Sequence, residues 1–245
     1  MLGGMIELPA AFGPTRDTLH RIATHVLGRR RSEVSGRFGL RTFASGIATP
    51  AFGDEPEVLR LSRTALVRER GAAATHLSVP GTTLRQLAAF VDTDLQRPFS
   101  VGHETVPVGD ADAVLELDLE STRLIGKWFG FGWEVLDTVV STLPTSASPA
   151  TTQLWPEHFD AATTVLTNSG TGVNLGFSPG DGFEAQPYAY VGPHDGARGG
   201  DPSFWNAPFG AVLTMQAITG AGDPFATVAD FLRTGLRHAG SEPDV

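Results

Sequence analysis

The sequence contains no cysteine. This absence excludes disulfide bonds, thiolate nucleophiles and zinc sites with cysteine ligands. Charged residues make up only 18% of the chain, whereas hydrophobic residues make up 41%. Disordered proteins combine high charge with low hydrophobicity, so we expect a folded protein with a substantial core.

Long apolar runs are lacking too. None approaches the length of a membrane span, and the start, residues 1–9, lacks the basic region and apolar stretch of a secretory signal. The sequence therefore predicts a cytoplasmic protein with no membrane partner.

Basic residues are in the minority. The chain has 18 Lys and Arg against 27 Asp and Glu, a formal net charge of −9. A field of this sign repels phosphate backbones, so we expect no nucleic-acid partner. The one basic run, Arg29 to Arg31, falls where the first predicted helix ends, and cations there complement the helix dipole.

The order of predicted elements favours an α+β fold, with mostly antiparallel sheets and packed helices, in a single domain of residues 1–245. Helices are expected over 14–35, 84–91, 120–143 and from Pro224, after Asp223 as N-cap. Strands are expected over 37–43, 57–61, 64–68, 73–79, 114–119, 161–166, 173–177, 187–191 and 210–218.

Two parts of the chain share this order of elements. Residues 14–112 and 113–240 each read as helix, four strands, helix, which suggests an ancient duplication into two similar halves. The identity between the halves is slight, so chance similarity of a coarse pattern is an equal alternative.

The segment Leu154 to Asp160 reads Leu-Trp-Pro-Glu-His-Phe-Asp. In an extended chain His158 and Asp160 project from one strand face, and Glu157 from the other. An imidazole and a carboxylate on one face can share a proton, which makes His158 and Asp160 the candidate catalytic residues.

The same two residues can bind a divalent metal if a further ligand is near. The candidates are the pairs His103-Glu104 and His194-Asp195, and the set His158, Asp160 and His194 is the predicted metal site. None of these pairs matches a specific metal motif. The sequence therefore requires no cofactor and leaves a divalent metal as an alternative.

A structural role for the segment is the competing interpretation. Trp155 and Phe159 would anchor it in the core while His158 and Asp160 fix a loop by hydrogen bonds. The other three histidines near helices, His20, His25 and His238, are expected on the surface.

Aromatic residues interleaved with polar ones crowd the C-terminal part, as in a small-molecule pocket, although core packing explains many of them. This aromatic group consists of Phe177, Phe183, Tyr188, Tyr190, Phe204, Trp205 and Phe209. Residues 174–182 are Gly-rich but lack the spacing of a phosphate loop, and Pro-Gly-Asp-Gly favours a hairpin turn. The candidate ligand-binding residues are Trp155, Glu157, Asn174, Asp181, Tyr190, His194, Trp205 and Asn206.

Four stretches together resemble an uncharacterised bacterial family of unknown function, which has a Leu-Trp-Pro-x-His-Phe-Asp motif followed by a Gly-Asp turn, a Tyr-rich strand and a Trp. They are 153–160, 176–181, 188–191 and 204–206, so the resemblance covers about the C-terminal 90 residues. It implies a shared fold and no particular activity.

Three hypotheses follow. The first is a protein that binds a small polar or aromatic molecule in a His, Asp and aromatic pocket of the C-terminal half. The second is a hydrolase or isomerase that uses His158 and Asp160, with or without a metal. The third is a homodimeric interaction module whose exposed aromatic residues form the interface.

Overall fold

The structure is a computed structural model that describes residues 7–43, 46–102, 105–144, 147–166, 170–196 and 198–240. Its contacts divide the chain into two compact units. The N-terminal unit comprises Leu8–Gly130 and returns for Leu154–Phe159. The C-terminal unit comprises Phe131–Gln153 and the described part of Asp160–Val245.

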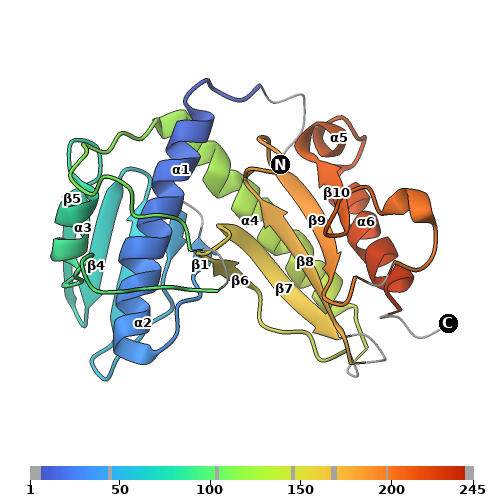
Figure 1. The fold of residues 1–245 in the computed structure, drawn as a ribbon, viewed down its shortest axis with the longest axis horizontal. Coiled ribbons are helices and arrows are strands. Elements are labelled where there is room, and N and C mark those ends of the chain that lie inside the picture. Colours follow the sequence, from blue (N-terminus) through green and yellow to red (C-terminus); the bar gives the residue numbers. More distant parts are fainter. Residues whose placement is uncertain are drawn as a thin grey trace. The chain divides into compact units, whose positions relative to one another are not determined.

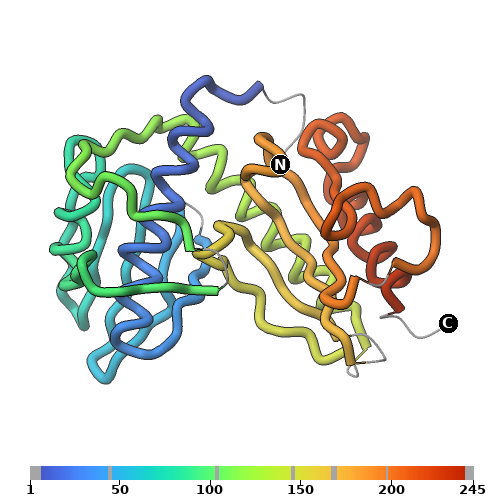
Figure 2. Tube along the Cα trace, viewed as in Figure 1, coloured from blue at the N-terminus to red at the C-terminus, as the bar shows by residue number. Residues whose placement is uncertain are grey.

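The N-terminal unit is a five-stranded antiparallel meander with helices before and after it (Figure 1). The sheet order is β1-β2-β3-β4-β5, the order of the strands in the chain, and Figure 2 traces the successive hairpins. Its elements are α1 (Phe12–Ile22), the π-helical turn η1 (Ala23–Gly28), α2 (Arg29–Ser35), β1 (Arg41–Phe43), β2 (Gly46–Ala48), β3 (Glu57–Ser62), β4 (Ala65–Arg70), β5 (Ala73–Ser78) and α3 (Leu84–Phe90).

The first helical region forms because its apolar residues recur at helical spacing. Leu19, Ile22 and Val26 are all at most 4% exposed, and Gly36 ends α2 in the left-handed conformation that glycine adopts most readily. The expected helix over 14–35 is therefore confirmed.

The basic run lies inside this helical region, so its expected place at the helix end is wrong. Arg29 and Arg31 are 1% and 8% exposed, and Arg30 pairs with Glu57 at 3.1 Å. These cations serve internal packing.

The C-terminal unit contains a second five-stranded antiparallel sheet, in the order β10-β9-β8-β7-β6 (Figure 1). Helix α4 (Leu119–Ser141) starts within the N-terminal unit and ends within this one. The other elements are β6 (Gln153–Trp155), of which Leu154 and Trp155 count with the N-terminal unit, β7 (Asp160–Leu166), β8 (Gly172–Ser178), β9 (Tyr188–Pro193), the 3₁₀ turn η3 (Pro202–Phe204), β10 (Ala211–Thr214), α5 (Met215–Thr219) and α6 (Pro224–His238).

One face of this sheet packs on helices. Phe177 of β8 meets Phe131 of α4 edge-on at 6.0 Å between ring centroids. A Cβ on Gly132 would come within 2.4 Å of the Phe177 ring, and one on Gly235 of α6 within 2.6 Å of the Val191 side chain. The two glycines let both helices approach the sheet closely. Side chains alternate between the faces of a sheet, so Gly176 and Tyr190, which neighbour Phe177 and Val191, lie on the other face.

The α+β class and the mostly antiparallel sheets are confirmed. Most expected strands are present, and Asp223 caps α6 by accepting from Ala226 N at 3.0 Å. The expected strand 114–119 is wrong, because only Val114 forms a bridge, to Thr83. The expected strand 210–218 ends at Thr214, whose hydroxyl caps α5.

Both units run helix, five-stranded meander, helix. The common order is what a duplication would leave, and the duplication itself stays a hypothesis. Among the helices of the described ranges, none combines the length and the apolar character needed to cross a bilayer.

Candidate functional site

The segment Leu154–Phe159 belongs to the N-terminal unit. Leu154 exchanges two backbone hydrogen bonds with Leu40, of 2.8 and 2.9 Å, beside the start of β1. The chain then turns over residues 156–159, and Phe159 has a left-handed φ of 53°. The shared strand face of His158 and Asp160 required an extended chain, and the turn removes it.

Polar side chains of the first helical region hold this turn. His20 Nε2 lies 2.9 Å from the carbonyl oxygen of Pro156 and 3.2 Å from that of Glu157. Thr24 Oγ1 donates to the same Pro156 carbonyl at 2.6 Å. Because the partners of Nε2 are carbonyl oxygens, that nitrogen carries the proton.

Burial lowers the pKa of His20 from 6.5 to about 4, although its hydrogen bonds to the two carbonyls act in the opposite direction. The ring is therefore neutral at pH 7. A neutral donor fixed to two backbone carbonyls holds structure and has no proton to exchange with a substrate.

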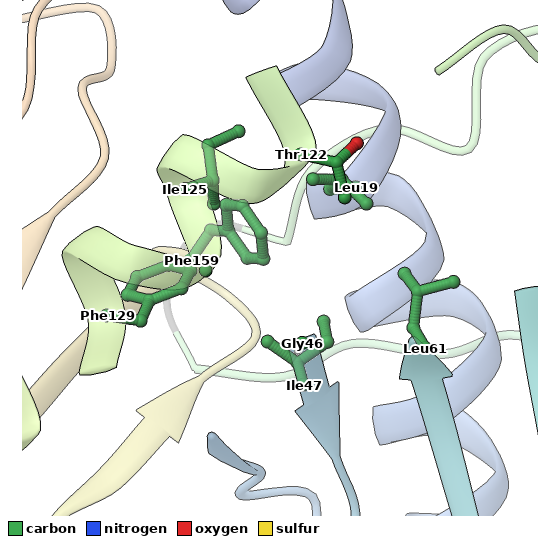
Figure 3. A pocket seen from close by; sticks show the side chains of 9 residues that line it. Leu19, Gly46, Ile47, Leu61, Thr122, Ile125, Phe129 and Phe159 are labelled. Atoms are coloured by element: carbon green, nitrogen blue, oxygen red, sulfur yellow. The ribbon is translucent and has the colours of Figure 1, made fainter. Parts of the chain in front are cut away.

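Phe159 anchors the turn in the core of the N-terminal unit, as the structural interpretation predicts. It is 2% exposed, stacks on His20 at 5.2 Å and meets Phe129 edge-on at 5.2 Å. Figure 3 shows its ring between Ile125 of α4 and Leu19 of α1, beside an apolar cavity of about 20 Å³. A cavity of this size holds about one water, so it is a packing gap and not a ligand site.

The two predicted catalytic residues lie in different units. His158 is exposed in the turn, whereas Asp160 begins β7 and is 4% exposed. The Asp160 carboxylate accepts a hydrogen bond from the Tyr190 hydroxyl of its own unit. Asp160 is thus part of a different constellation from the one predicted.

Both tyrosines of the chain lie on the face of the C-terminal sheet opposite to Phe177 and Val191. The Tyr188 hydroxyl donates to Asp181 Oδ2 at 2.6 Å, and the Tyr190 hydroxyl to Asp160. We call Asp160, Asp181, Tyr188 and Tyr190 the tyrosine–aspartate cluster. Gly176 pairs with Tyr190 in register, and a Cβ there would lie 2.4 Å from the tyrosine ring.

Burial raises the pKa of Tyr188 and of Tyr190 above the usual 10.0. The hydrogen bond to Asp181 adds to this effect at Tyr188, and the negative charge of Asp160 adds to it at Tyr190. Both phenols therefore stay protonated near neutral pH and act as donors. The cluster therefore presents hydrogen-bond donors and no tyrosinate near neutral pH.

Two exposed phenyl rings lie directly beside this cluster. Phe183 and Phe209 are 47% and 40% exposed, and their centroids lie 5.1 Å apart. Phe183 contacts Tyr188 at 6.0 Å, and Phe209 contacts Tyr190 at 6.1 Å. We call Phe183 and Phe209 the phenylalanine pair. Sequence reasoning included both rings in the aromatic group but did not select them as binding residues.

Asp181 connects the two features. Its Oδ1 accepts from the backbone nitrogens of Phe183 at 2.8 Å and Glu184 at 3.1 Å, while Oδ2 accepts from Tyr188. These bonds fix the turn that carries Phe183, and the Asp181 side chain remains exposed to solvent. The expected hairpin turn at residues 179–182 thus places a carboxylate next to an aromatic surface.

The predicted metal set does not assemble within the C-terminal unit. His194 N donates to Gly172 O at 2.9 Å, and Gly172 pairs with Leu166 at the far end of β7 from Asp160. Six residues of strand separate Asp160 from that end, roughly 20 Å. Over the described ranges no cluster of three or more His, Asp or Glu side chains could hold a metal, and His103 and Glu104 lie outside those ranges.

Asn174 and His194 pair with each other, Nε2 to Oδ1 at 2.9 Å, and Thr164 donates to the same Asn174 oxygen at 2.7 Å. Trp205 donates to Gly199 O at 2.8 Å. None of these hydrogen bonds connects Asn174, His194 or Trp205 to the tyrosine–aspartate cluster.

Asn206 serves the edge of β10. Its side-chain amide donates to Val212 O at 3.0 Å and accepts from Val212 N at 2.8 Å, as a neighbouring strand would. Of the predicted ligand-binding residues, Trp155 and Glu157 belong to the N-terminal unit. Trp155 packs edge-on against Phe38 at 5.9 Å.

The expectation that His25 lies on the surface is wrong, and His20 is half-buried. His25 is 2% exposed and its Nε2 lies 2.6 Å from Val106 O, while burial lowers its pKa. All six residues of the π-helical turn are buried. A π-helical turn takes more residues than an α-helical one, which changes the residues that face inward and defeats a count of 3.6 per turn.

Charged side chains form a network at the base of the N-terminal sheet that sequence reasoning missed. Glu57 is 3% exposed and contacts Arg30, Arg68 and Arg70. Burial acts to raise the Glu57 pKa, but hydrogen bonds from Arg30 and Arg70 outweigh it and lower the pKa. With Asp92 paired to Arg68, both carboxylates have arginine partners within the unit, and the network is structural.

A groove of about 680 Å³ also lies in the N-terminal unit, lined by α1, the Pro80-Gly81 turn and residues 113–118. Its size suits a small molecule. The polar side chains of this groove, however, mostly form hydrogen bonds with nearby backbone atoms. Arg21 donates to Val108 O at 2.9 Å, and Asp118 accepts from Ser121 N at 2.7 Å.

Comparison with known proteins adds no relative. No protein-family model, curated protein or solved structure matches the chain. The resemblance to the bacterial family with the Leu-Trp-Pro-x-His-Phe-Asp motif stays a prediction. The geometry of the C-terminal unit is therefore the basis for a functional proposal.

Proposed function

We propose that the C-terminal unit binds a small aromatic molecule that carries a cationic or hydrogen-bond-donating group. The observation that supports this proposal is the phenylalanine pair, two exposed rings 5.1 Å apart, set beside the tyrosine–aspartate cluster. Exposed apolar surface next to a few convergent polar groups is the usual composition of a small-molecule site.

The aromatic part of the ligand packs on the phenylalanine pair. Phe183 and Phe209 meet at 75°, so one presents a face where the other presents an edge. An added ring can stack on the first and meet the second edge-on, the two geometries that aromatic groups prefer. Tyr188 packs against Phe183 and Tyr190 packs against Phe209, which restricts the movement of both phenylalanine rings.

The polar part of the ligand contacts Asp181. Its two oxygens accept three hydrogen bonds within the chain, and a carboxylate has about four acceptor positions. An exposed carboxylate with spare capacity favours a cation or a donor. The net charge of −9 draws cations toward the protein as a whole.

The hydrolase or isomerase hypothesis has less support. It needs a general base, and the tyrosines are protonated donors while Asp160 is buried against Tyr190. His158 belongs to the other unit. A divalent metal bound by His158, Asp160 and His194 would require Asp160 and His194 to meet, and they lie at opposite ends of β7.

Affinity measurements with p-aminobenzamidine, a fluorescent aromatic cation, test the proposal. Phe209→Ala removes one ring of the pair, and we expect the affinity to fall about tenfold, in line with an aromatic contact and its buried area. Asp181→Asn keeps the turn acceptor but removes the charge, and a similar loss is expected. Leu166→Ala is the control, since Leu166 is 41% exposed at the other end of β7.

The proposal is wrong if the probe does not bind, or if it binds the Phe209→Ala and Asp181→Asn variants as tightly as the Leu166→Ala variant. Neutral indole serves as a second probe. Binding of indole that is lost in Phe209→Ala but unchanged in Asp181→Asn would retain the aromatic site and refute the cationic preference.

The homodimer hypothesis is the second candidate, because the same two exposed rings could meet a second copy. Replacing Phe183 and Phe209 together by serine would then convert a dimer into a monomer in light scattering. An unchanged mass would remove this interface.

A further inference from the structure

The edge strand β5 of the N-terminal sheet is open to solvent. It is the last strand of the sheet order and lies at its outer side in Figure 1. Five of its six residues are exposed and Leu77 is half-buried. An edge of this kind presents backbone donors and acceptors to which another strand can pair.

The register identifies the groups that point outward. Residue Val79 N donates to Thr64 O at 2.8 Å, one position beyond the Ala65–Ser78 pair. Hydrogen-bonded pairs alternate along an antiparallel ladder, so Ala73, Thr75 and Leu77 bond to β4. The N–H and C=O groups of Ala74, His76 and Ser78 therefore face the free edge.

These outward groups are almost all unused within the described ranges. The Ser78 carbonyl accepts from Thr82 Oγ1 at 3.2 Å. No hydrogen bond from the described residues reaches the outward backbone groups of Ala74 and His76. The open stretch is thus the centre of the strand.

Two other sheet edges have hydrogen-bonded partners among the described residues. At β10 the Asn206 side chain bonds both backbone groups of Val212 in place of a strand. Beside β1, Leu40 exchanges two backbone bonds with Leu154. The contrast makes β5 the exception, because its edge lacks such a cover among the residues that the structure describes.

The composition of β5 also lacks the usual protection against pairing. Its sequence is Ala-Ala-Thr-His-Leu-Ser, with no lysine, arginine, acidic residue, proline or glycine. Natural edge strands are commonly guarded by charges, prolines or bulges. An uncharged strand can face an identical strand without like-charge repulsion.

We propose that β5 pairs with β5 of a second copy of this chain, antiparallel about a two-fold axis at His76. In this register Ala74 of one copy lies opposite Ser78 of the other, and His76 lies opposite His76. These are the residues whose backbone groups point outward, so their bonds complete the ladder, and the two five-stranded sheets become one ten-stranded sheet.

The side chains are self-complementary in this arrangement. Small residues, Ala74 and Ser78, face each other at both ends of the contact. On the opposite face of the sheet Thr75 lies across from Leu77, so each apolar side chain meets a β-branched one. The charges of the neighbouring β4 strand are paired within the unit, Arg68 and Arg70 with Glu57 and Asp92, and Glu69 with Arg60.

The contact is short, because six residues span roughly 20 Å of strand. An interface of this size falls below the area of a standard permanent complex. The dimer is therefore expected to depend on protein concentration over the micromolar range.

Crosslinking tests this arrangement cleanly, because the chain has no cysteine of its own. The His76→Cys variant places one thiol on the two-fold axis. Directly opposed residues of a hydrogen-bonded pair have Cα atoms about 5.5 Å apart, within disulfide range. Mild oxidation of the full-length variant should give a disulfide dimer at least tenfold faster than oxidation of the matched control Ala72→Cys, placed in the adjacent exposed turn.

A second substitution tests whether the strand edge mediates the contact. Ala74→Pro removes one outward N–H and no bond to β4, a position where an edge strand accepts proline. In the His76→Cys background, Ala74→Pro should slow disulfide formation to the rate of the Ala72→Cys control. In the wild-type chain, it should abolish the concentration-dependent rise in mass seen by light scattering.

The proposal fails if the wild-type chain stays at 25.9 kDa up to high micromolar concentration and the thiols at positions 76 and 72 oxidise at equal rates. It also fails if a dimer forms but is unchanged by Ala74→Pro. Loss of that dimer on replacing Phe183 and Phe209 would instead assign it to the phenylalanine pair. None of these outcomes alters the test with p-aminobenzamidine, so the two proposals stand or fall separately.

Discussion

At the scale of single residues, the two tyrosines are the most direct probes of the C-terminal unit. Tyr188 and Tyr190 are the only tyrosines of the chain, and each donates to an aspartate. Burial first, and the carboxylates second, raise the pKa of both phenols above 10.0. We predict that neither ionises near pH 10 while the protein is folded.

An alkaline titration followed at 295 nm measures tyrosinate directly. Because the folded-state pKa values are raised, the stability they contribute is present below pH 10 and is lost as pH rises above it. The tyrosinate signal should appear together with unfolding, as followed by circular dichroism. A signal that titrates near pH 10 in the folded protein contradicts the cluster.

His20 makes a second prediction at this scale. Its pKa of about 4 lies below the 6.5 of the unfolded chain. The neutral folded form therefore adds stability above pH 6.5, and this contribution is lost as pH falls from 6.5 through 4. The loss between pH 7 and pH 4.5 should be about 2 kcal/mol from this residue, at 1.36 kcal/mol per pKa unit.

Chemical denaturation of the His20→Gln variant at both pH values checks this prediction. Glutamine can still donate to the Pro156 carbonyl but does not titrate, so the variant should lose about 2 kcal/mol less than the wild-type chain on acidification. The control is His76→Gln, at an exposed site, measured below the micromolar concentrations at which pairing of β5 is expected. Equal acid sensitivity of wild type and His20→Gln would refute the assignment.

Sequence alone selected some of these residues and missed others for a physical reason. Asp160, Asp181 and Tyr190 were selected, and all three belong to the cluster. Tyr188 was named in the aromatic group but not selected. His20 was missed because its partners are backbone carbonyls 136 and 137 positions away, and carbonyls leave no signature in a sequence.

At the scale of elements, helix α4 carries glycines with opposite roles. A Cβ on Gly130 would meet nothing within 4 Å, whereas one on Gly132 would lie 2.4 Å from the Phe177 ring. Alanine has the higher helix propensity by about 1 kcal/mol. Gly130→Ala should therefore stabilise the protein by about 0.5 to 1 kcal/mol, and Gly132→Ala should destabilise it by about 1 to 3 kcal/mol through overpacking.

Urea denaturation of the two variants, only two positions apart in one helix, separates propensity from packing. If Gly132→Ala were as stable as Gly130→Ala, the close approach of α4 to β8 would be wrong. If Gly130→Ala were destabilising, the open space beside Gly130 would be wrong.

Elements with strong periodicity were predictable, and short ones were not. The bounds of β3, β4, β5 and α6 were predicted to within a few residues, because the residue pattern and the signals at the ends of each element indicate the same boundaries. Strands β2 and β6 have three residues each, too few for a period. Residues 215–218 are apolar enough for a strand, but the Thr214 hydroxyl caps Ala217 N at 3.3 Å and starts a helix.

At the scale of the whole molecule, the division into two units explains why the predicted pocket was only partly right. The chain returns to the N-terminal unit for Leu154–Phe159 before it enters β7. A strand-like reading of Leu154 to Asp160 joined residues that the fold assigns to different units. This return of the chain to the N-terminal unit depends on the turn at Phe159 and on the burial of its ring, which local sequence patterns do not specify.

The central claim is that the phenylalanine pair and Asp181 form a binding surface for a small aromatic cation. Mapping of backbone amide shifts by NMR during titration with benzamidine tests it most directly. The account predicts that the largest shifts occur at Phe183, Glu184 and Phe209 and disappear in Phe209→Ala. Shifts centred on the groove of residues 113–118, or no saturable shifts at all, would contradict it.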